Sequence, residues 1–166
     1  MRYPLTKINN NDVCAEIGVW KGDFSSDILK RNPSILHLID PWVHQDYKKM
    51  WYSIEQKKMD TIYNNVCKKF ADDSRVKIHR NFSTEVKFPN EHFDWVYIDG
   101  NHTYPMVVKD LEFYYPLVKK GGFLCGDDYG WTSIDCLMGP KPAIDEFVKA
   151  YNLSLEIKGN QFVINV

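Results

Sequence analysis

Short apolar runs alternate along this chain with longer stretches in which apolar residues recur every three or four positions. A continuous apolar run predicts a strand buried on both faces, whereas the three-and-four spacing predicts an amphipathic helix. Five strands are predicted, at residues 13–17, 35–39, 76–79, 93–98 and 123–126. The predicted helices lie over about 22–31, within 45–70, from 105 to about 118, and over 143–150. This alternation predicts a parallel sheet with helices on both faces.

Two further strands are predicted towards the C-terminal end of the sequence. Residues 153–157 and 161–166 are joined by Lys-Gly-Asn at 158–160, a turn sequence that indicates a hairpin. The hairpin brings the sheet to seven strands and adds one antiparallel strand. Upstream, Lys-Lys-Gly-Gly at 119–122 is predicted to close the preceding helix, because basic residues and glycine suit a helix C-terminus. Without a linker or an internal repeat, residues 1–166 are predicted to form one domain.

The composition is that of a globular protein, and it narrows the classes of partner. Of 166 residues, 44% are hydrophobic and 26% are charged, and the net charge is -1. This balance gives no electrostatic case for nucleic acid or a membrane surface, and no apolar run approaches the roughly 20 residues that span a bilayer. The first residues lack the apolar segment of a secretory signal, and the four cysteines lack zinc-site spacing. We therefore expect a cytoplasmic protein with reduced thiols.

Acidic residues stand where four of the predicted strands end. They are Glu16, Asp40, Asp99, and the adjacent Asp127 and Asp128. In an open parallel sheet, ligands bind at the carboxyl ends of the strands, near the point where the strand order reverses. A single acid at such a place is more often a turn former or a helix cap. Five acids at four strand ends favour a ligand site.

The first predicted strand is followed by a turn that begins and ends on glycine, Gly18-x-x-x-Gly22. Glycine lets the backbone approach a ligand closely before a helix starts. A nicotinamide dinucleotide site is the competing interpretation, but it requires G-x-G-x-x-G, and here two of these glycines are missing and Glu16 would repel phosphate. S-adenosylmethionine has no phosphate and carries an ammonium and a sulfonium, which nearby carboxylates tolerate. Asp40 stands where a carboxylate accepts hydrogen bonds from ribose hydroxyls.

Four motifs follow one another in a specific order. They are Glu-Ile-Gly-Val-x-x-Gly at 16–22, Leu-Ile-Asp-Pro-Trp at 38–42, Tyr-Ile-Asp-Gly-Asn-His-x-Tyr at 97–104, and Gly-Gly-Phe-Leu-Cys-Gly-Asp-Asp-Tyr at 121–129. With them the sequence resembles the class I S-adenosylmethionine-dependent methyltransferases, and among these the small metal-dependent O-methyltransferases of the macrocin (sugar) type. The resemblance implies a Rossmann-like, doubly wound seven-stranded α/β sheet of order 3-2-1-4-5-7-6, with strand 7 antiparallel.

The resemblance also assigns residues to the cofactor. It implies that the methionine end of S-adenosylmethionine is lined by Glu16, Gly18 and Gly22, and that Asp99 both contacts the cofactor and takes part in catalysis. It implies that Asp40 holds the ribose and that Ser83, just after the third strand, approaches the adenine. Trp42 is a candidate apolar wall for the adenine, with a place in the core as the open alternative.

Three acids match the metal ligands of the resembling family: Asp99, Asp127 and Asp128. An all-oxygen set suits Mg²⁺, whereas the alternative is that the adjacent pair only forms an acidic turn. A bound metal would lower the pKa of an acceptor hydroxyl. His102, three residues beyond Asp99, is the candidate general base, with a surface role as the alternative. The remaining histidines have no chemical role assigned: His37 is predicted to be structural, and no partner is evident for His44, His79 and His92.

The predicted function is metal-assisted methyl transfer from S-adenosylmethionine to a hydroxyl of a small sugar, polyol or catechol-like acceptor. An oxidoreductase resembling cephalosporin hydroxylase and a non-catalytic S-adenosylmethionine-binding module are the alternatives. Few residues precede the first strand to cover the acceptor. Its walls would come from residues 42–70, from Tyr129, Trp131 and Met138 in the loop 129–141, or from another subunit of a homo-oligomer.

Overall fold

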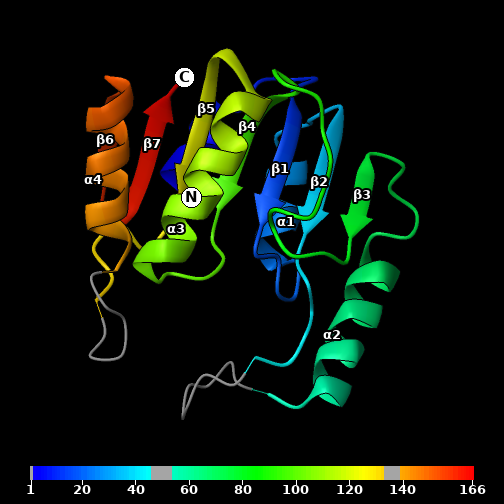
Figure 1. Cartoon of the computed structure of the whole chain (residues 1–166). Coiled ribbons are helices and arrows are strands. Elements are labelled where there is room, and N and C mark those ends of the chain that lie inside the picture. The colour runs from blue at the N-terminus through cyan, green and yellow to red at the C-terminus, as the bar shows by residue number, and fades with distance from the viewer. Residues whose placement is uncertain (1, 46–53, 133–138) are drawn as a thin grey trace.

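The computed structural model describes residues 2–45, 54–132 and 139–166, and its centre is a seven-stranded mixed sheet (Figure 1). The strands are β1 (Val13–Ile17), β2 (Ile35–Ile39), β3 (Val76–His79), β4 (Phe93–Ile98), β5 (Val118–Gly126), β6 (Ser154–Lys158) and β7 (Gln161–Asn165). Their order is β3-β2-β1-β4-β5-β7-β6, and β7 runs antiparallel to both neighbours. The predicted fold class and strand order are confirmed.

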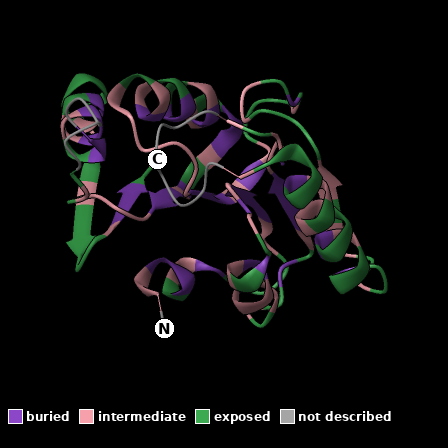
Figure 2. Cartoon of the chain, turned by 90° about the horizontal axis from the view of Figure 1, so that it is seen from below, coloured by how far each residue is buried: buried purple, intermediate pink, exposed green. Residues whose placement is uncertain are grey.

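Helices cover both faces of the sheet, as Figure 2 shows from below. The helices are η1 (Tyr3–Lys7), α1 (Asp23–Leu29), α2 (Gln56–Lys69), α3 (Tyr104–Tyr114), η2 (Tyr115–Leu117) and α4 (Pro140–Tyr151), where η marks a 3₁₀ helix. One hydrophobic core joins α3 and α4 to the sheet, and a second joins η1, α1 and α2 to its other face. Alternate side chains of each buried strand enter the two cores, because successive strand residues point to opposite faces.

The segment 119–122 lies inside β5, so the prediction that it closes a helix is wrong. The helix α3 ends earlier, at Tyr114, and the chain continues into η2, because Pro116 has no backbone N–H to extend the α-helical hydrogen bonds. The glycines instead allow close pairing within the sheet. The Gly121 N–H donates to the carbonyl of Val166 at 2.6 Å, and the Val166 N–H donates to the carbonyl of Gly122 at 3.0 Å.

The connection from β3 to β4, residues 80–92, contains no helix and breaks the predicted alternation. It is held by side chains that pack on β2 and β3. His37 of β2 is 8% exposed, and its Nδ1 lies 2.9 Å from Nε2 of His79. The rings of Phe88 and His92 lie 4.9 and 5.6 Å from the ring of His37. Three of the four histidines without an assigned chemical role, His37, His79 and His92, therefore form a structural cluster with aromatic neighbours.

This histidine cluster is expected to make the fold sensitive to acid. Burial lowers the pKa of His37 to about 4, against 6.5 for an ordinary histidine. Because the folded-state pKa is depressed, His37 costs no stability above pH 6.5, and its cost grows as the pH falls towards 4, where it reaches about 3 kcal/mol. Urea unfolding from pH 7 to 4 checks this. We expect a steep loss of unfolding free energy in the wild type and a shallower one in His37→Phe.

The matched control is His44→Gln, because His44 lies outside this cluster and its Nδ1 contacts the carbonyl of Ile54 instead. Its stability profile should follow that of the wild type. Parallel profiles for the wild type and His37→Phe would contradict the assignment.

Cys14 in β1 and Cys125 in β5 are free thiols buried in the core. Cys136 lies outside the described residues, as do residues 46–53 of the predicted helical stretch 45–70. Across the described ranges, no helix has both the length and the apolar character that crossing a bilayer requires.

Candidate functional site

The turn after β1 touches the end of β4 and requires glycine to do so. Gly18 has φ +87°, and a Cβ at this position would lie 2.2 Å from the carbonyl oxygen of Asp99. Gly22 has φ +69°, stands immediately before α1, and faces the ring of Phe70. The turn therefore lies at the carboxyl ends of β1 and β4. The strand order reverses between these two strands, and open α/β sheets bind ligands at this point.

Asp40 joins the end of β2 to this turn through backbone hydrogen bonds. Its Oδ2 accepts the N–H groups of Val19 and Trp20, both at 3.0 Å, and its Oδ1 accepts the N–H of Trp42 at 2.7 Å. Burial raises the pKa of this carboxyl, and the three bonds oppose the rise. Because each carboxylate oxygen accepts about two hydrogen bonds, one position on Oδ1 remains. The predicted contact of Asp40 with ribose stays a prediction.

Trp42 and Ser83 are engaged with the protein itself. Trp42 is 1% exposed, and its indole N–H donates to the carbonyl of Trp20 at 2.8 Å. Of its two predicted roles, the place in the core is the one this burial favours. The hydroxyl of Ser83 donates to Asp110 of α3 at 2.5 Å, and its carbonyl accepts the hydroxyl of Tyr114. Ser83 thus fixes the β3–β4 loop to α3, and its contact with adenine stays a prediction.

Glu16, at the end of β1, is 2% exposed and lies beneath α1. Its carboxyl accepts the hydroxyl of Ser25 at 2.5 Å. Removal from water raises the pKa of Glu16 from 4.5 to about 8, chiefly because the charged form is desolvated. The side chain is therefore largely protonated at neutral pH.

Two predicted metal-binding acids converge with the predicted general base. The Nε2 of His102 lies 3.3 Å from Asp128 Oδ2 and 3.9 Å from Asp99 Oδ1. These three residues each offer one ligand atom, and all three atoms lie within 4.8 Å of one another. The third predicted ligand is directed differently. Asp127 accepts the N–H of Asp128 at 2.9 Å through Oδ1, and its Oδ2 lies 3.3 Å from the guanidinium of Arg2.

Arg2 is a site residue that the sequence did not reveal. Its Nη1 donates to Asp99 Oδ2 at 3.1 Å and to the hydroxyl of Tyr97 at 2.9 Å. The guanidinium carbon lies 4.4 Å from the centre of the Phe24 ring at the start of α1. Arg2 stands before η1, and its side chain contacts residues that are far from it in the sequence. In the sequence, the one signal for its role is that a basic residue precedes β1, whose neighbours β2 and β4 are followed by Asp40 and Asp99.

The loop after β5 contributes an aromatic side chain to the cluster. The Trp131 ring lies 5.4 Å from that of His102, and the Trp131 N–H donates to the carbonyl of Asp128 at 2.8 Å. Tyr129, another predicted acceptor wall, instead donates its hydroxyl to Asp145 of α4 at 2.6 Å. Met138 lies outside the described residues.

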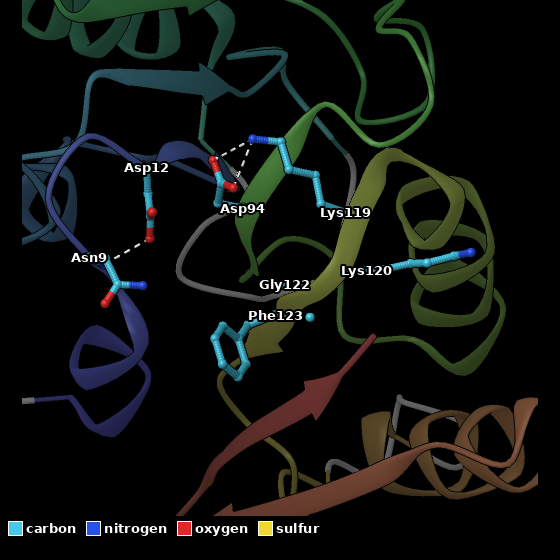
Figure 3. A pocket seen from close by; sticks show the side chains of 8 residues that line it. Asn9, Asp12, Asp94, Lys119, Lys120, Gly122 and Phe123 are labelled. Atoms are coloured by element: carbon cyan, nitrogen blue, oxygen red, sulfur yellow. Dashed lines mark hydrogen bonds and ion pairs between the residues drawn. The ribbon is translucent and has the colours of Figure 1, made fainter.

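A separate cavity of about 120 Å³ lies at the amino ends of the parallel strands, away from the carboxyl ends that form the candidate site (Figure 3). It adjoins the amino ends of β1 and β4, and Asp94 within it is paired with Lys119 at 2.8 Å. None of the residues predicted to bind the cofactor, the metal or the acceptor lines it.

This chain belongs to the methyltransferase domain family, which matches it over residues 15–129. An uncharacterized protein of Acanthamoeba polyphaga mimivirus is 30% identical over 123 residues, which are 69% of this chain and 50% of that protein. The chain thus spans about half the length of this curated relative.

Solved structures of methyltransferases have the same fold. A protein from Corynebacterium glutamicum superposes with TM-score 0.63 at 16% identity, covering 98% of this chain and 76% of its own. An S-adenosylmethionine-dependent methyltransferase from Mesorhizobium loti gives 0.61 at 9%, covering 93% and 90%. Fibrillarin from Aeropyrum pernix, with natively bound S-adenosyl-L-methionine, gives 0.60 at 13%, covering 99% and 68%. The superpositions cover 98%, 93% and 99% of this chain, so the described fold is shared along nearly its whole length.

Proposed function

We propose that the protein transfers the methyl group of S-adenosylmethionine to a hydroxyl of a small sugar, polyol or catechol-like acceptor, with help from a divalent cation. The observation that carries the proposal is the convergence of Asp99, His102 and Asp128 beside the Gly18 turn. The family membership supports methyl transfer, and the S-adenosyl-L-methionine bound to fibrillarin supports the cofactor. Neither supports the alternative oxidoreductase or a non-catalytic module.

The residues present fit a divalent cation. Asp99 and Asp128 supply carboxylate oxygens and His102 an imidazole nitrogen. Asp127 can complete the set only if its carboxylate turns away from Arg2. Asp127 would give the all-oxygen set that suits Mg²⁺, whereas an imidazole nitrogen favours Mn²⁺ or Zn²⁺. A divalent cation supplies Lewis acidity, which lowers the pKa of an acceptor hydroxyl and stabilises the negative charge that develops on its oxygen.

His102 accepts the proton of the acceptor hydroxyl in the proposed reaction. As the methyl group moves from sulfur to oxygen, the carbon–sulfur electron pair stays on sulfur, and the hydroxyl proton must leave. His102 lies beside both carboxylates, and the Trp131 ring flanks its imidazole. A nitrogen that binds a metal cannot take up this proton at the same time, so the two roles of His102 are mutually exclusive.

Methyl transfer from labelled S-adenosylmethionine to a panel of sugars, polyols and catechols tests the proposal. Treatment with a chelator and the change Asp128→Asn should each lower turnover at least about 100-fold, while calorimetry finds cofactor affinity within a few-fold of the wild type. His102→Gln should lower kcat by about 10²–10⁴ without weakening Mn²⁺ binding, measured by paramagnetic resonance. The exposed Asp72→Asn is the matched control, with activity unchanged.

Each part of the proposal has its own contrary result. Absence of S-adenosylmethionine binding at millimolar concentration rejects methyl transfer. Full turnover after chelation rejects the metal. A tenfold loss of Mn²⁺ affinity in His102→Gln makes His102 a ligand and rejects its role as base.

A further inference from the structure

The segment before β1 places a guanidinium among the acids at the carboxyl ends of β4 and β5. We propose that Arg2 binds the carboxylate of the methionine part of S-adenosylmethionine. This inference rests on the proposed function and names the group that recognises one end of its methyl donor.

The ligand has a carboxylate at one end, and Arg2 is the residue that offers this carboxylate a positive charge at the site. The methionine part carries an ammonium, a sulfonium and a carboxylate. Those of the acids Asp99, Asp127 and Asp128 that a divalent cation does not neutralise attract the two cationic groups and repel the carboxylate. Within residues 2–45, 54–132 and 139–166, Arg2 is the only arginine or lysine that forms an ion pair with any of these acids. It is therefore the cation placed to accept the carboxylate.

The strand order sets which part of the ligand reaches Arg2. The ends of β2, β1 and β4 stand side by side in that order, and neighbouring strands are about 4.8 Å apart. A ligand whose ribose meets Asp40 after β2 crosses the Gly18 turn after β1. Its remaining part then reaches the end of β4, where Arg2 contacts Tyr97 and Asp99.

The guanidinium is held in a fixed orientation and keeps one edge available. All its hydrogen bonds and ion pairs with the described residues use Nη1, and its side chain is 38% exposed. The guanidinium carbon lies 4.4 and 5.7 Å from the centres of the Phe24 and Tyr97 rings, and these cation–π contacts restrict the motion of the group. The remaining Nε and Nη2 edge has the fork geometry that binds a carboxylate with two parallel hydrogen bonds. Little ordering is then needed when the ligand binds.

The competing explanation is that Arg2 only neutralises Asp99 and Asp127. In that case its loss would alter the binding of any cationic ligand and would not depend on a carboxylate. Decarboxylated S-adenosylmethionine separates the two explanations, because it lacks that group and keeps the adenosine, the sulfonium and the ammonium.

Calorimetric titration of both ligands into the wild type, Arg2→Met and Arg2→Gln tests the inference. The wild type should bind S-adenosylmethionine at least about tenfold more tightly than the decarboxylated form, the range of a charge-assisted hydrogen bond. Both variants should lose this preference, and Arg2→Lys should recover part of it. Arg75→Met is the matched control, because Arg75 pairs with Asp73 and not with the site acids, and it should keep the preference.

The outcomes distinguish this inference from the proposed function. A wild type without the preference, or a preference that survives in Arg2→Met or Arg2→Gln, overturns the role of Arg2 while methyl transfer stands. A wild type that binds neither ligand overturns the proposed function itself. Circular dichroism of each variant establishes that it is folded. The ratio of the wild-type affinities for S-adenosylmethionine and its decarboxylated form tests the inference even if no variant folds.

Discussion

Replacing Gly18 with alanine is expected to destabilise the protein by about 3 kcal/mol and to abolish binding of S-adenosylmethionine. The positive φ of +87° alone costs an L-residue about 1–2 kcal/mol. The added methyl group would also lie 2.2 Å from the carbonyl oxygen of Asp99 and 2.8 Å from the Cα of Gly100. Both are backbone atoms, so the β1 turn and the end of β4 must separate, at a further cost of about 1–3 kcal/mol.

A second glycine isolates the clash from the backbone strain. Gly121 has φ +78°, but a Cβ there would meet no atom within 4 Å. Gly121→Ala should therefore lose only about 1 kcal/mol and should bind S-adenosylmethionine as the wild type does. Urea unfolding and calorimetric titration of the two variants measure both effects. Equal losses of stability in Gly18→Ala and Gly121→Ala would show that the close approach to the Asp99 carbonyl does not destabilise the protein.

The sequence predicted the bounds of β1 to β4 because β1, β2 and β4 are short, mainly apolar runs between polar segments and β3 alternates apolar and polar residues. It could not place the start of β5. Lys-Lys-Gly-Gly fits the end of a helix as well as a strand, and the choice is made by hydrogen bonds to Val166, more than 40 residues away. The β3–β4 connection was missed for a similar reason. Its packing depends on His37 and Tyr114, which neighbouring residues do not reveal.

The candidate site was predictable where strand ends determine it. Gly18, Asp99 and Asp128 come together because β1, β4 and β5 are adjacent and parallel. The sequence could not show that Asp128 faces His102 while Asp127 faces Arg2. This difference follows from the left-handed backbone of Asp128, with φ +58°. Arg2 was missed because η1 must fold across the sheet before it meets Asp99, 97 residues away.

Replacing Glu16 with glutamine is expected to stabilise the protein at pH 8 and above by about 3–5 kcal/mol. The pKa of Glu16 is about 8 in the folded protein, against 4.5 for an ordinary glutamic acid. Because the folded-state pKa is raised, the stability that this group contributes is complete below pH 4.5 and is lost as the pH rises through 8. Glutamine keeps an acceptor for the hydroxyl of Ser25 and cannot ionise, so this loss should disappear.

Urea unfolding of the wild type and Glu16→Gln between pH 4 and 9 measures the difference. The exposed Glu112→Gln is the matched control, and its profile should follow the wild type. A buried acid that lowers stability at neutral pH is typical of a functional position, where stability is given up for activity. We therefore expect Glu16→Gln to bind S-adenosylmethionine about tenfold more weakly at pH 9, because Glu16 is ionised above its pKa of about 8 and then attracts the sulfonium of the ligand. Unchanged affinity in a stabilised variant would assign Glu16 to the support of α1 through Ser25 and remove it from the cofactor site.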